Sequence, residues 1–219
     1  MDHEYLKFKR FVQIVRDTVY HEPETPNFHN KIIDSVINDI VLPLNLPKDS
    51  AILDVGCGSG YFMRAMRDLG YKDVTGITLN DEDIAECDED GLKTLKSDFT
   101  FIDLPDQSVD FIFCRHSLEH SVFPFFTLIE YNRLLKQDAP IYIEVPAERT
   151  DRKHEDNGNH YAIMGNEMWA SLFVRAGFDL EYIKAFVFDL TDDQNGILVN
   201  QKEKFYLCML TKKVDMYNV

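Results

Sequence analysis

A glycine-rich segment, Asp54-Val-Gly-Cys-Gly-Ser-Gly60, has the spacing that most clearly indicates a binding site in this sequence. Its glycines permit backbone conformations that other residues avoid, and they let a ligand approach the main chain closely. The segment lacks the Gly-Lys-Ser/Thr ending of a phosphate loop, and its last glycine comes one residue too early for the nicotinamide fingerprint. A carboxylate two residues before the first glycine would repel a pyrophosphate. The segment therefore predicts a turn that holds a ligand with a cationic amino group.

A second polar segment, Cys114-Arg-His-Ser-Leu-Glu-His120, follows an apolar run. Its His-x-x-Glu-His pattern occurs in one class of zinc proteases, where a helix places both histidines on one face. Here the segment leaves a predicted strand and the next helix begins near 121–124, so no metal is expected. His116 is the candidate catalytic residue, because an imidazole with a pKa of about 6.5 can accept a proton at neutral pH. His120 is either a substrate-site residue or a structural histidine bonded to the backbone.

The elements that must position these segments alternate between strand and helix after residue 48. Short apolar runs predict strands at 51–55, 73–79, 92–96, 109–114, 140–145, 178–190 and 204–211. Helices are predicted at 61–69, at 81–89 with Asn80 as cap, at 123–136, and at 167–176 with Asn166 as cap. This alternation predicts an α/β fold with a mostly parallel sheet, and the last two strands predict an antiparallel pair at one edge. Both polar segments then lie at the carboxyl ends of strands, where such sheets bind ligands.

The first 48 residues have helical apolar spacing, with a second helix at 30–41 and a proline-containing loop at 21–27. They are expected to form a helical lid over a domain that spans 49–219. A long polar loop, 149–161, is a second candidate for covering the site. The expected substrate and lid residues from these two regions and from the second polar segment are Tyr20, His21, His120, Arg149, His160 and Tyr161.

The composition disfavours several classes of partner. The chain has 219 residues, of which 45% are hydrophobic, so it can build one domain with a small appendage. Its 23 Lys and Arg against 38 Asp and Glu give a net charge of −15, which disfavours binding to nucleic acid or to an anionic membrane surface. Its four cysteines lie in separate segments, which indicates neither a disulfide framework nor a zinc ribbon. A cytoplasmic protein is expected.

The glycine segment, in its strand–turn–helix context, resembles that of class I S-adenosylmethionine-dependent methyltransferases, over roughly residues 50–145 and more loosely to 211. The resemblance implies a Rossmann-like three-layer sandwich with a seven-stranded sheet, S-adenosylmethionine as cofactor and S-adenosylhomocysteine as product. The Leu118-Glu-His120 sequence is similar to the segment after the fourth strand in many small-molecule methyltransferases. The implied activity is methyl transfer to an oxygen, nitrogen or carbon atom of a small-molecule acceptor.

The resemblance also implies a role for individual residues. The acid at position 54 would help hold the methionine end, and Asp98 and Phe99 would contact the adenine. The family usually ends the second strand with an acid that binds the ribose, but Thr78 stands there. Its hydroxyl would contribute roughly 0.5–1.5 kcal/mol instead of roughly 1.5–3 kcal/mol, so weaker binding or help from Asn80 is expected. The full set of implied cofactor contacts is Asp54, Gly56, Cys57, Gly58, Gly60, Thr78, Leu79, Asn80, Asp98, Phe99, Cys114 and Arg115.

Two other functions stay open at this point. A fold-mate that binds the cofactor without catalysis would serve as an interaction partner, and the missing acid of the second strand favours it. A protein methyltransferase is the other alternative, because a basic peptide would suit the acidic surface. A homodimer is left open as well.

Overall fold

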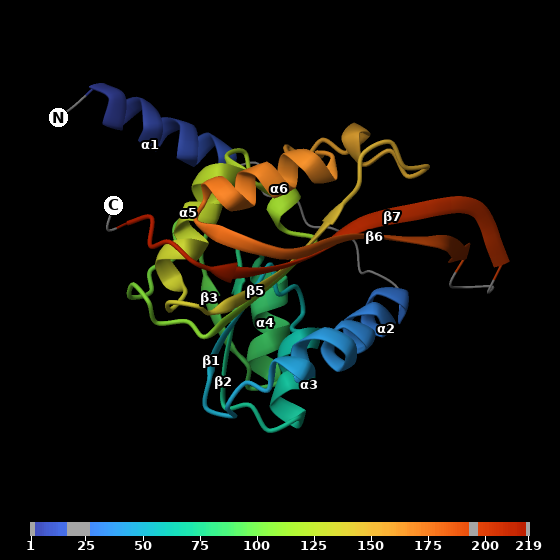
Figure 1. Ribbon diagram of the computed structural model, residues 1–219, viewed down its shortest axis with the longest axis horizontal. Helices are drawn as coiled ribbons and strands as arrows, with labels where there is room; N and C mark the ends of the chain where they lie inside the picture. Colours follow the sequence, from blue (N-terminus) through green and yellow to red (C-terminus); the bar gives the residue numbers. More distant parts are fainter. Residues whose placement is uncertain (1–2, 17–26, 193–196, 218–219) are drawn as a thin grey trace.

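The computed structural model describes residues 3–16, 27–192 and 197–217, and these form a three-layer α/β structure around one sheet (Figure 1). The strands of the described chain are β1 (Ala51–Val55), β2 (Asp73–Thr78), β3 (Lys93–Lys96), β4 (Phe111–Arg115), β5 (Pro140–Pro146), β6 (Phe178–Asp192) and β7 (Ile197–Lys212). Its α-helices are α1 (His3–Arg16), α2 (Asn27–Val36), α3 (Tyr61–Asp68), α4 (Asp81–Glu89), α5 (Pro124–Leu134) and α6 (Asn166–Arg175).

The strands of the described residues form one seven-stranded sheet in the order β3-β2-β1-β4-β5-β7-β6. The pairs from β3 to β5 are all parallel, and β7 runs antiparallel to both of its neighbours. The expected Rossmann-like sheet with an antiparallel edge pair is confirmed. The β6–β7 pair continues well beyond the rest of the sheet, as an arm that projects from the body (Figure 1).

Helices cover both faces of the sheet because the central strands are apolar on both sides. Alternate residues of β1, β4 and β5 enter different clusters: Leu53, Ile112 and Ile143 pack on one face with residues of α5 and α6. Ile52, Phe113 and Tyr142 pack on the other face with residues of α2 and α3. The carboxyl ends of β1 to β5 therefore emerge between the two helical layers, at one edge.

The N-terminal region divides into two parts by its packing. The end of α2 continues into a π-helix (Ile37–Val41) and a 3₁₀ turn (Leu42–Leu44), and Val36, Ile37 and Val41 are buried in the core. Helix α1 instead lies against the loops at the carboxyl edge of the sheet: Phe8 contacts Phe101 with ring centroids 5.9 Å apart. Of the described N-terminal helices, α1 thus lies over the carboxyl edge of the sheet as the predicted lid would, whereas α2 is part of the core. Tyr20 and His21, and the proline-containing loop, lie outside the described residues.

Most element predictions are confirmed, with two differences at helix starts and one at a strand start, since β7 begins at Ile197 and not at 204. Asn80 caps α4 as expected, with its Oδ1 accepting from the Glu82 N–H at 2.7 Å. Asn166 is not a cap: it is the first residue of α6, and Gly165 precedes it without a side-chain hydrogen bond. Helix α2 begins at Asn27, three residues before the predicted start at residue 30. None of the helices in the described residues has the length and apolar character needed to cross a membrane.

Candidate functional site at the carboxyl edge of the sheet

The glycine segment forms the turn between β1 and α3 with left-handed backbone conformations that favour glycine. Gly56 and Gly58 have φ angles of +73° and +50°. A Cβ atom on Gly56 would overlap the side chain of Ser117 at the end of β4, so the close approach of two strands requires this glycine. At Gly58, by contrast, no atom lies within 4 Å of the Cβ position. Gly58 therefore borders open space where a ligand can reach the main chain.

Asp54 provides a buried carboxylate beside this turn. It is 3% exposed, and its Oδ2 has no hydrogen-bond partner in the described chain. Burial, assisted by the nearby Cys87 thiol, raises the pKa of Asp54 from 3.8 to about 8. A buried acid with an unsatisfied oxygen is costly unless a cation or donor completes it. A ligand with an ammonium group fits this position.

The end of β2 holds a carboxylate that the sequence analysis did not assign. The Thr78 hydroxyl donates to Asp83 Oδ2 at 3.2 Å and accepts from the Asn80 N–H at 3.1 Å. Asp83 lies in the first turn of α4, three residues after the cap, and this spacing of cap and acid is a recognisable signal. The acid that β2 lacks is therefore supplied from the following helix. Asn80, which was expected to help bind the ribose, uses its side-chain amide oxygen to cap α4.

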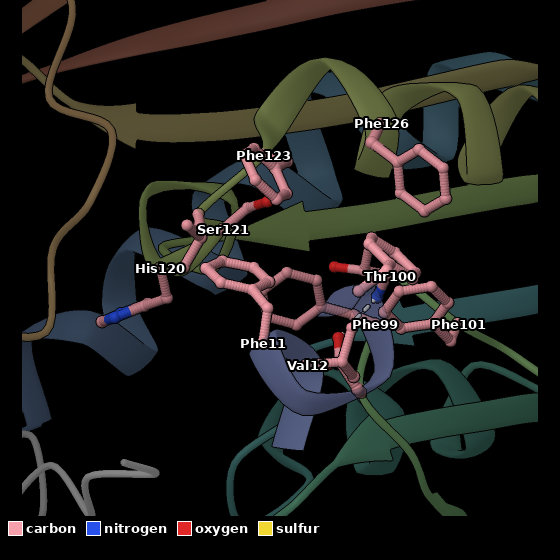
Figure 2. Close-up of a pocket in the computed structure, with 12 residues that line it drawn as sticks. Phe11, Val12, Phe99, Thr100, Phe101, His120, Ser121, Phe123 and Phe126 are labelled. Atoms are coloured by element: carbon pink, nitrogen blue, oxygen red, sulfur yellow. Dashed lines mark hydrogen bonds between the residues drawn. The ribbon is translucent and has the colours of Figure 1, made fainter. Parts of the chain in front are cut away.

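A cleft with an empty volume of about 400 Å³ lies where the loop after β3 meets the start of α5 (Figure 2). Asp98 and Phe99 line it, as the prediction of an adenine site requires. Asp98 also accepts a hydrogen bond from the Thr100 N–H at 2.9 Å, so it shapes the turn as well. Most other lining groups are apolar, and aromatic rings from three segments face one another across the space in Figure 2.

Helix α1 closes one side of this cleft. Phe8, Phe11 and Val12 line it, and the Phe11 ring lies 5.1 Å from the Phe123 ring. The Phe8 ring also lies 6.2 Å from that of Phe126. Both partners belong to the segment that starts α5. The cleft is therefore an apolar chamber with a few polar groups, which is the usual form of a small-molecule site.

A cluster of buried charges follows β4. Arg115 Nε lies 2.9 Å from Glu144 Oε1, and the Arg115 side chain is 8% exposed. His116 Nε2 lies 3.1 Å from the same Glu144 oxygen, while His116 Nδ1 lies 3.2 Å from Glu119 Oε1. Glu144 and Glu119 are 0% and 1% exposed. The two cations hold the Glu144 pKa at about 2 although burial opposes this. The cluster pairs two carboxylates with two cations.

His116 differs from its predicted state. Burial disfavours the imidazolium, but hydrogen bonds to Glu119 and Glu144 outweigh this and raise the His116 pKa to about 9. The expectation of a neutral base with a pKa near 6.5 is wrong, because Glu119 and Glu144 both contact the ring and the sequence pattern does not predict these contacts. His116 also has a φ of +49°, a conformation that non-glycine residues adopt rarely and mostly at constrained sites. At neutral pH it is a positively charged donor.

The expected cysteine contacts turn away from the site. The Cys114 thiol is fully buried, with Sγ 3.8 Å from the Tyr131 hydroxyl, so only its main chain can face a ligand. Cys57 packs in a small cluster with Met63 and Cys87 below the glycine turn. The hydrogen bond with the Cys87 thiol, together with burial, raises the Cys57 pKa, and burial raises the Cys114 pKa, so the Cys57 and Cys114 thiols stay protonated at neutral pH. These cysteines serve packing.

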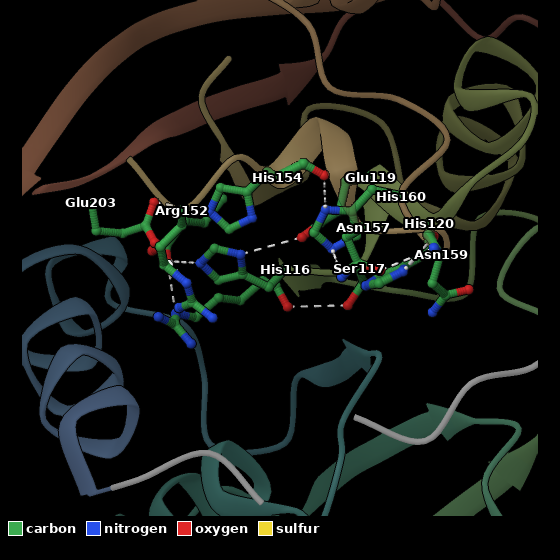
Figure 3. A network of polar contacts seen from close by, with 12 residues as sticks. His116, Ser117, Glu119, His120, Arg152, His154, Asn157, Asn159, His160 and Glu203 are labelled. Carbon is green, nitrogen blue, oxygen red and sulfur yellow. Dashed lines mark hydrogen bonds and ion pairs between the residues drawn. The ribbon is translucent and has the colours of Figure 1, made fainter. Parts of the chain in front are cut away.

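The last residues of the loop 149–161 contact the segment that follows β4. The N–H of Tyr161 donates to Glu119 O at 2.8 Å, and His160 is half-buried beside His120, with ring centroids 4.8 Å apart (Figure 3). His120 donates from Nδ1 to Asn159 O at 2.9 Å, as a structural histidine would, yet it also lines the cleft. Arg149, the other expected residue, is exposed and has its backbone N–H bound by Glu155.

A family model matches the middle of the chain. Residues 53–143 match the family model described as a methyltransferase domain, and this range contains the glycine turn, Thr78, Asp98 and the His116 segment. No curated protein sequence matches the chain.

Solved structures share the fold at low sequence identity. The YcgJ protein from Bacillus subtilis is 14% identical, with a TM-score of 0.67, over 83% of this chain and 99% of that one. A SAM-dependent methyltransferase from Methanosarcina mazei is 19% identical, with a TM-score of 0.63, over 80% and 98% of the two chains. The 4+2 cyclase SpnF is 18% identical, with a TM-score of 0.64, over 84% and 81%.

The residues present fit the cofactor of that family. The unsatisfied Asp54 oxygen and the open space at Gly58 suit an ammonium-bearing ligand, while Asp83 supplies the charged acceptor at the end of β2. The match over residues 53–143, the shared fold and the residues of the site together support a class I S-adenosylmethionine-dependent methyltransferase.

Proposed function

We propose that this methyltransferase transfers a methyl group to an oxygen, nitrogen or carbon atom of a small-molecule acceptor with an apolar body. The cleft carries this proposal. It adjoins Asp98 and Phe99, and it is closed by aromatic side chains from α1 and α5. An apolar acceptor would displace water from these rings, with a gain of roughly 25 cal/mol for each Å² of apolar surface buried. A charged peptide would find few partners among them.

Three carboxylates would hold the cofactor along the strand ends. Asp54 would pair with the amino group of its methionine end, Asp83 with Thr78 would bind the ribose hydroxyls, and Asp98 would accept from the adenine amino group. The bound cofactor supplies an activated methyl group together with its own leaving group. The chain's task is then to align the acceptor for in-line displacement and to exclude water.

His116 would contribute a fixed positive charge to this site. Its ring is held between Glu119 and Glu144, so its orientation is fixed and its positive charge is balanced. Both ring N–H groups are directed at these carboxylates, so His116 has no lone pair to remove a proton and would act on the acceptor only through its charge. Helix α1 would act as the lid, because its aromatic side chains lie on the cleft. Opening and closing of α1 would admit the acceptor and then shield it.

Titration with S-adenosylhomocysteine tests the cofactor part of the proposal, and a labelled methyl donor tests the acceptor part. Calorimetry should show one site per chain. A fractionated metabolite extract incubated with protein and labelled cofactor should yield a labelled product that partitions into organic solvent. Label that enters a basic peptide library instead would indicate a protein methyltransferase. Cofactor binding with no labelled product from either source would favour the non-catalytic alternative.

Phe123→Ala provides a matched check on the cleft once an acceptor is known. Phe123 is 48% exposed and packs against Phe11 in the cleft, with the two ring planes tilted by 37°. Its removal should raise KM for the acceptor by about tenfold, equivalent to about 1.4 kcal/mol of lost apolar contact, and leave S-adenosylhomocysteine affinity unchanged. Steady-state kinetics and calorimetry would measure the two effects. Equal losses of both affinities would place the cleft within the cofactor site instead.

A further inference from the structure

Three side chains at the end of β4 offer metal-ligating atoms to a common point. One ligand atom each from Glu119, His120 and His160 lies within 4.8 Å of the other two. Glu119 and His120 belong to the 3₁₀ turn Leu118–His120, and His160 comes from the loop after β5. Figure 3 shows these residues, far apart in the sequence, side by side.

Backbone hydrogen bonds hold the two segments together. The N–H groups of Tyr161 and Ala162 both donate to Glu119 O, at 2.8 and 3.0 Å. His120 Nδ1 lies 2.9 Å from Asn159 O, which ties the same loop to the 3₁₀ turn from the other side. The fold therefore brings the three side chains near one another before any ligand arrives.

The hydrogen bonds of both histidines leave Nε2 as the ligating atom. His120 Nδ1 lies 2.9 Å from Asn159 O, and His160 Nδ1 lies 3.0 Å from His154 O. A carbonyl oxygen can only accept, so each Nδ1 carries the proton and each neutral ring has its lone pair on Nε2. Metal-binding histidines typically show this arrangement, in which a backbone carbonyl fixes the tautomer and orients the ring.

Glu119 completes the set with a carboxylate oxygen that the described chain leaves unsatisfied. Its side chain is 1% exposed, and Oε1 accepts from His116 Nδ1 at 3.2 Å. Its Oε2 is buried with no hydrogen-bond partner. A buried, unpartnered carboxylate oxygen beside two oriented imidazoles is costly unless a cation binds there.

We propose that Glu119, His120 and His160 bind a divalent transition-metal cation, with further coordination positions left open. Two imidazole nitrogens and one carboxylate oxygen suit Zn²⁺, Fe²⁺, Mn²⁺ or Co²⁺, whereas Ca²⁺ and Mg²⁺ prefer oxygen ligands alone. Bonds of about 2.1 Å require ligand atoms roughly 3–3.5 Å apart, so the side chains close by about 1 Å on binding. The Asn157 Nδ2 contact to His160 Nε2, at 3.2 Å, is displaced in the process.

This site differs from the zinc-protease arrangement, in which both histidines of the His-x-x-Glu-His pattern bind the metal. His116, the first histidine of that pattern, is held by Glu119 and Glu144 and is no ligand. His160, distant in the sequence, takes its place. Because His120 also lines the cleft, a cation here could hold an oxygen atom of the acceptor, an extension that rests on the proposed function.

Calorimetric titration of the chelator-treated full chain with Zn²⁺, and optical titration with Co²⁺, test the site. Wild type should bind one cation, and His160→Ala and His120→Ala should each weaken binding by more than about 100-fold, since even outer-shell changes cost 10–100-fold. His154→Gln is the matched control: it changes a histidine of the same loop whose side chain bonds Glu203 and stacks on His160, and it keeps the backbone carbonyl that accepts from His160 Nδ1. The Zn²⁺ affinity of the His154→Gln protein should equal that of wild type.

A second measurement needs no variant. Zn²⁺ should protect His120 and His160 of the wild-type chain from modification by diethyl pyrocarbonate, as mapped by mass spectrometry. Zn²⁺ binding that survives both alanine substitutions, or a wild type that neither binds nor is protected, would overturn the proposal. S-adenosylhomocysteine titrated into the same samples separates the two ideas, because retained cofactor binding without metal binding leaves the proposed methyl transfer intact.

Discussion

Asp54→Asn is expected to weaken cofactor binding roughly 10- to 100-fold, because a charge-assisted hydrogen bond worth about 1.5–3 kcal/mol is lost. The same substitution should stabilise the empty protein. Asp54 is buried, and its Oδ2 has no partner in the described chain, so ionising it there is unfavourable. An asparagine amide has the same shape and no charge to desolvate. Loss of binding together with a gain in stability would separate a ligand-binding acid from a structural one.

The pH dependence of binding follows from the Asp54 pKa, which burial raises from 3.8 to about 8. At pH 7 the empty protein holds the acid protonated, and an ammonium group binds its ionised form, so binding releases close to one proton. Cofactor affinity should therefore rise about tenfold per pH unit as the pH approaches 8. The titratable groups that face Asp54 are the thiols of Cys57, Cys87 and Cys114. Of these, the Cys57 and Cys114 thiols have raised pKa values and stay neutral over this range, whereas the hydrogen bond with Cys57 lowers the Cys87 pKa, so the slope that Asp54→Asn retains measures the contribution of Cys87.

The stability of the empty protein should change in the opposite sense. A raised pKa means that the folded state binds the proton more tightly than the unfolded state does. The stabilisation is thus complete below the unfolded pKa of 3.8 and is lost as the pH rises to about 8. The loss should amount to a few kcal/mol and be absent in Asp54→Asn.

Calorimetry with S-adenosylhomocysteine at pH 6, 7 and 8, in two buffers of different ionisation enthalpy, would measure both affinity and proton release. Asp98→Asn is the matched control. It alters another carboxylate of the proposed cofactor site, and it should lower affinity without changing the pH slope. A slope that is the same for wild type and Asp54→Asn would show that the acid at 54 does not pair with the ligand.

Glu144→Gln is expected to destabilise the protein by about 3–5 kcal/mol, the usual cost of removing one partner from a buried ion pair. Glu144 is 0% exposed and is the partner of both Arg115 and His116, at 2.9 and 3.1 Å. It also accepts from the Tyr142 hydroxyl at 2.7 Å. An amide would leave the Arg115 charge in the interior without its counter-charge.

Urea unfolding would measure this effect, and an exposed ion pair gives the comparison. Lys93 and Asp73 lie 3.4 Å apart with side chains 62% and 51% exposed, so Asp73→Asn should cost at most about 1 kcal/mol. Replacing both charges, as in Arg115→Met with Glu144→Leu, should recover part of the stability because neither charge remains unpaired. A Glu144→Gln protein as stable as Asp73→Asn would contradict the assignment of a buried charge cluster.

Local signals in the sequence determined the fold and the glycine turn. The short apolar runs and the cap at Asn80 act over a few residues, and they lie where the sequence predicts them except that β7 begins at Ile197. The strand–turn–helix context of 54–60 likewise depends on neighbours in the chain. The failure at Asn166 is local too: the helix begins one residue earlier, so the asparagine lies inside it.

The chemical state of the site depended on residues that only the folded chain brings together. Glu144, from β5, converges with Glu119 on His116 and turns an expected base into a cation. Asp83, in the next helix, brings a carboxylate to the Thr78 hydroxyl at the end of β2, and His160 joins Glu119 and His120 from a loop forty residues further along the chain. Electrostatic interactions and ligand geometry depend on distance in space, whereas the patterns that sequence analysis detects extend over a helix turn or a strand.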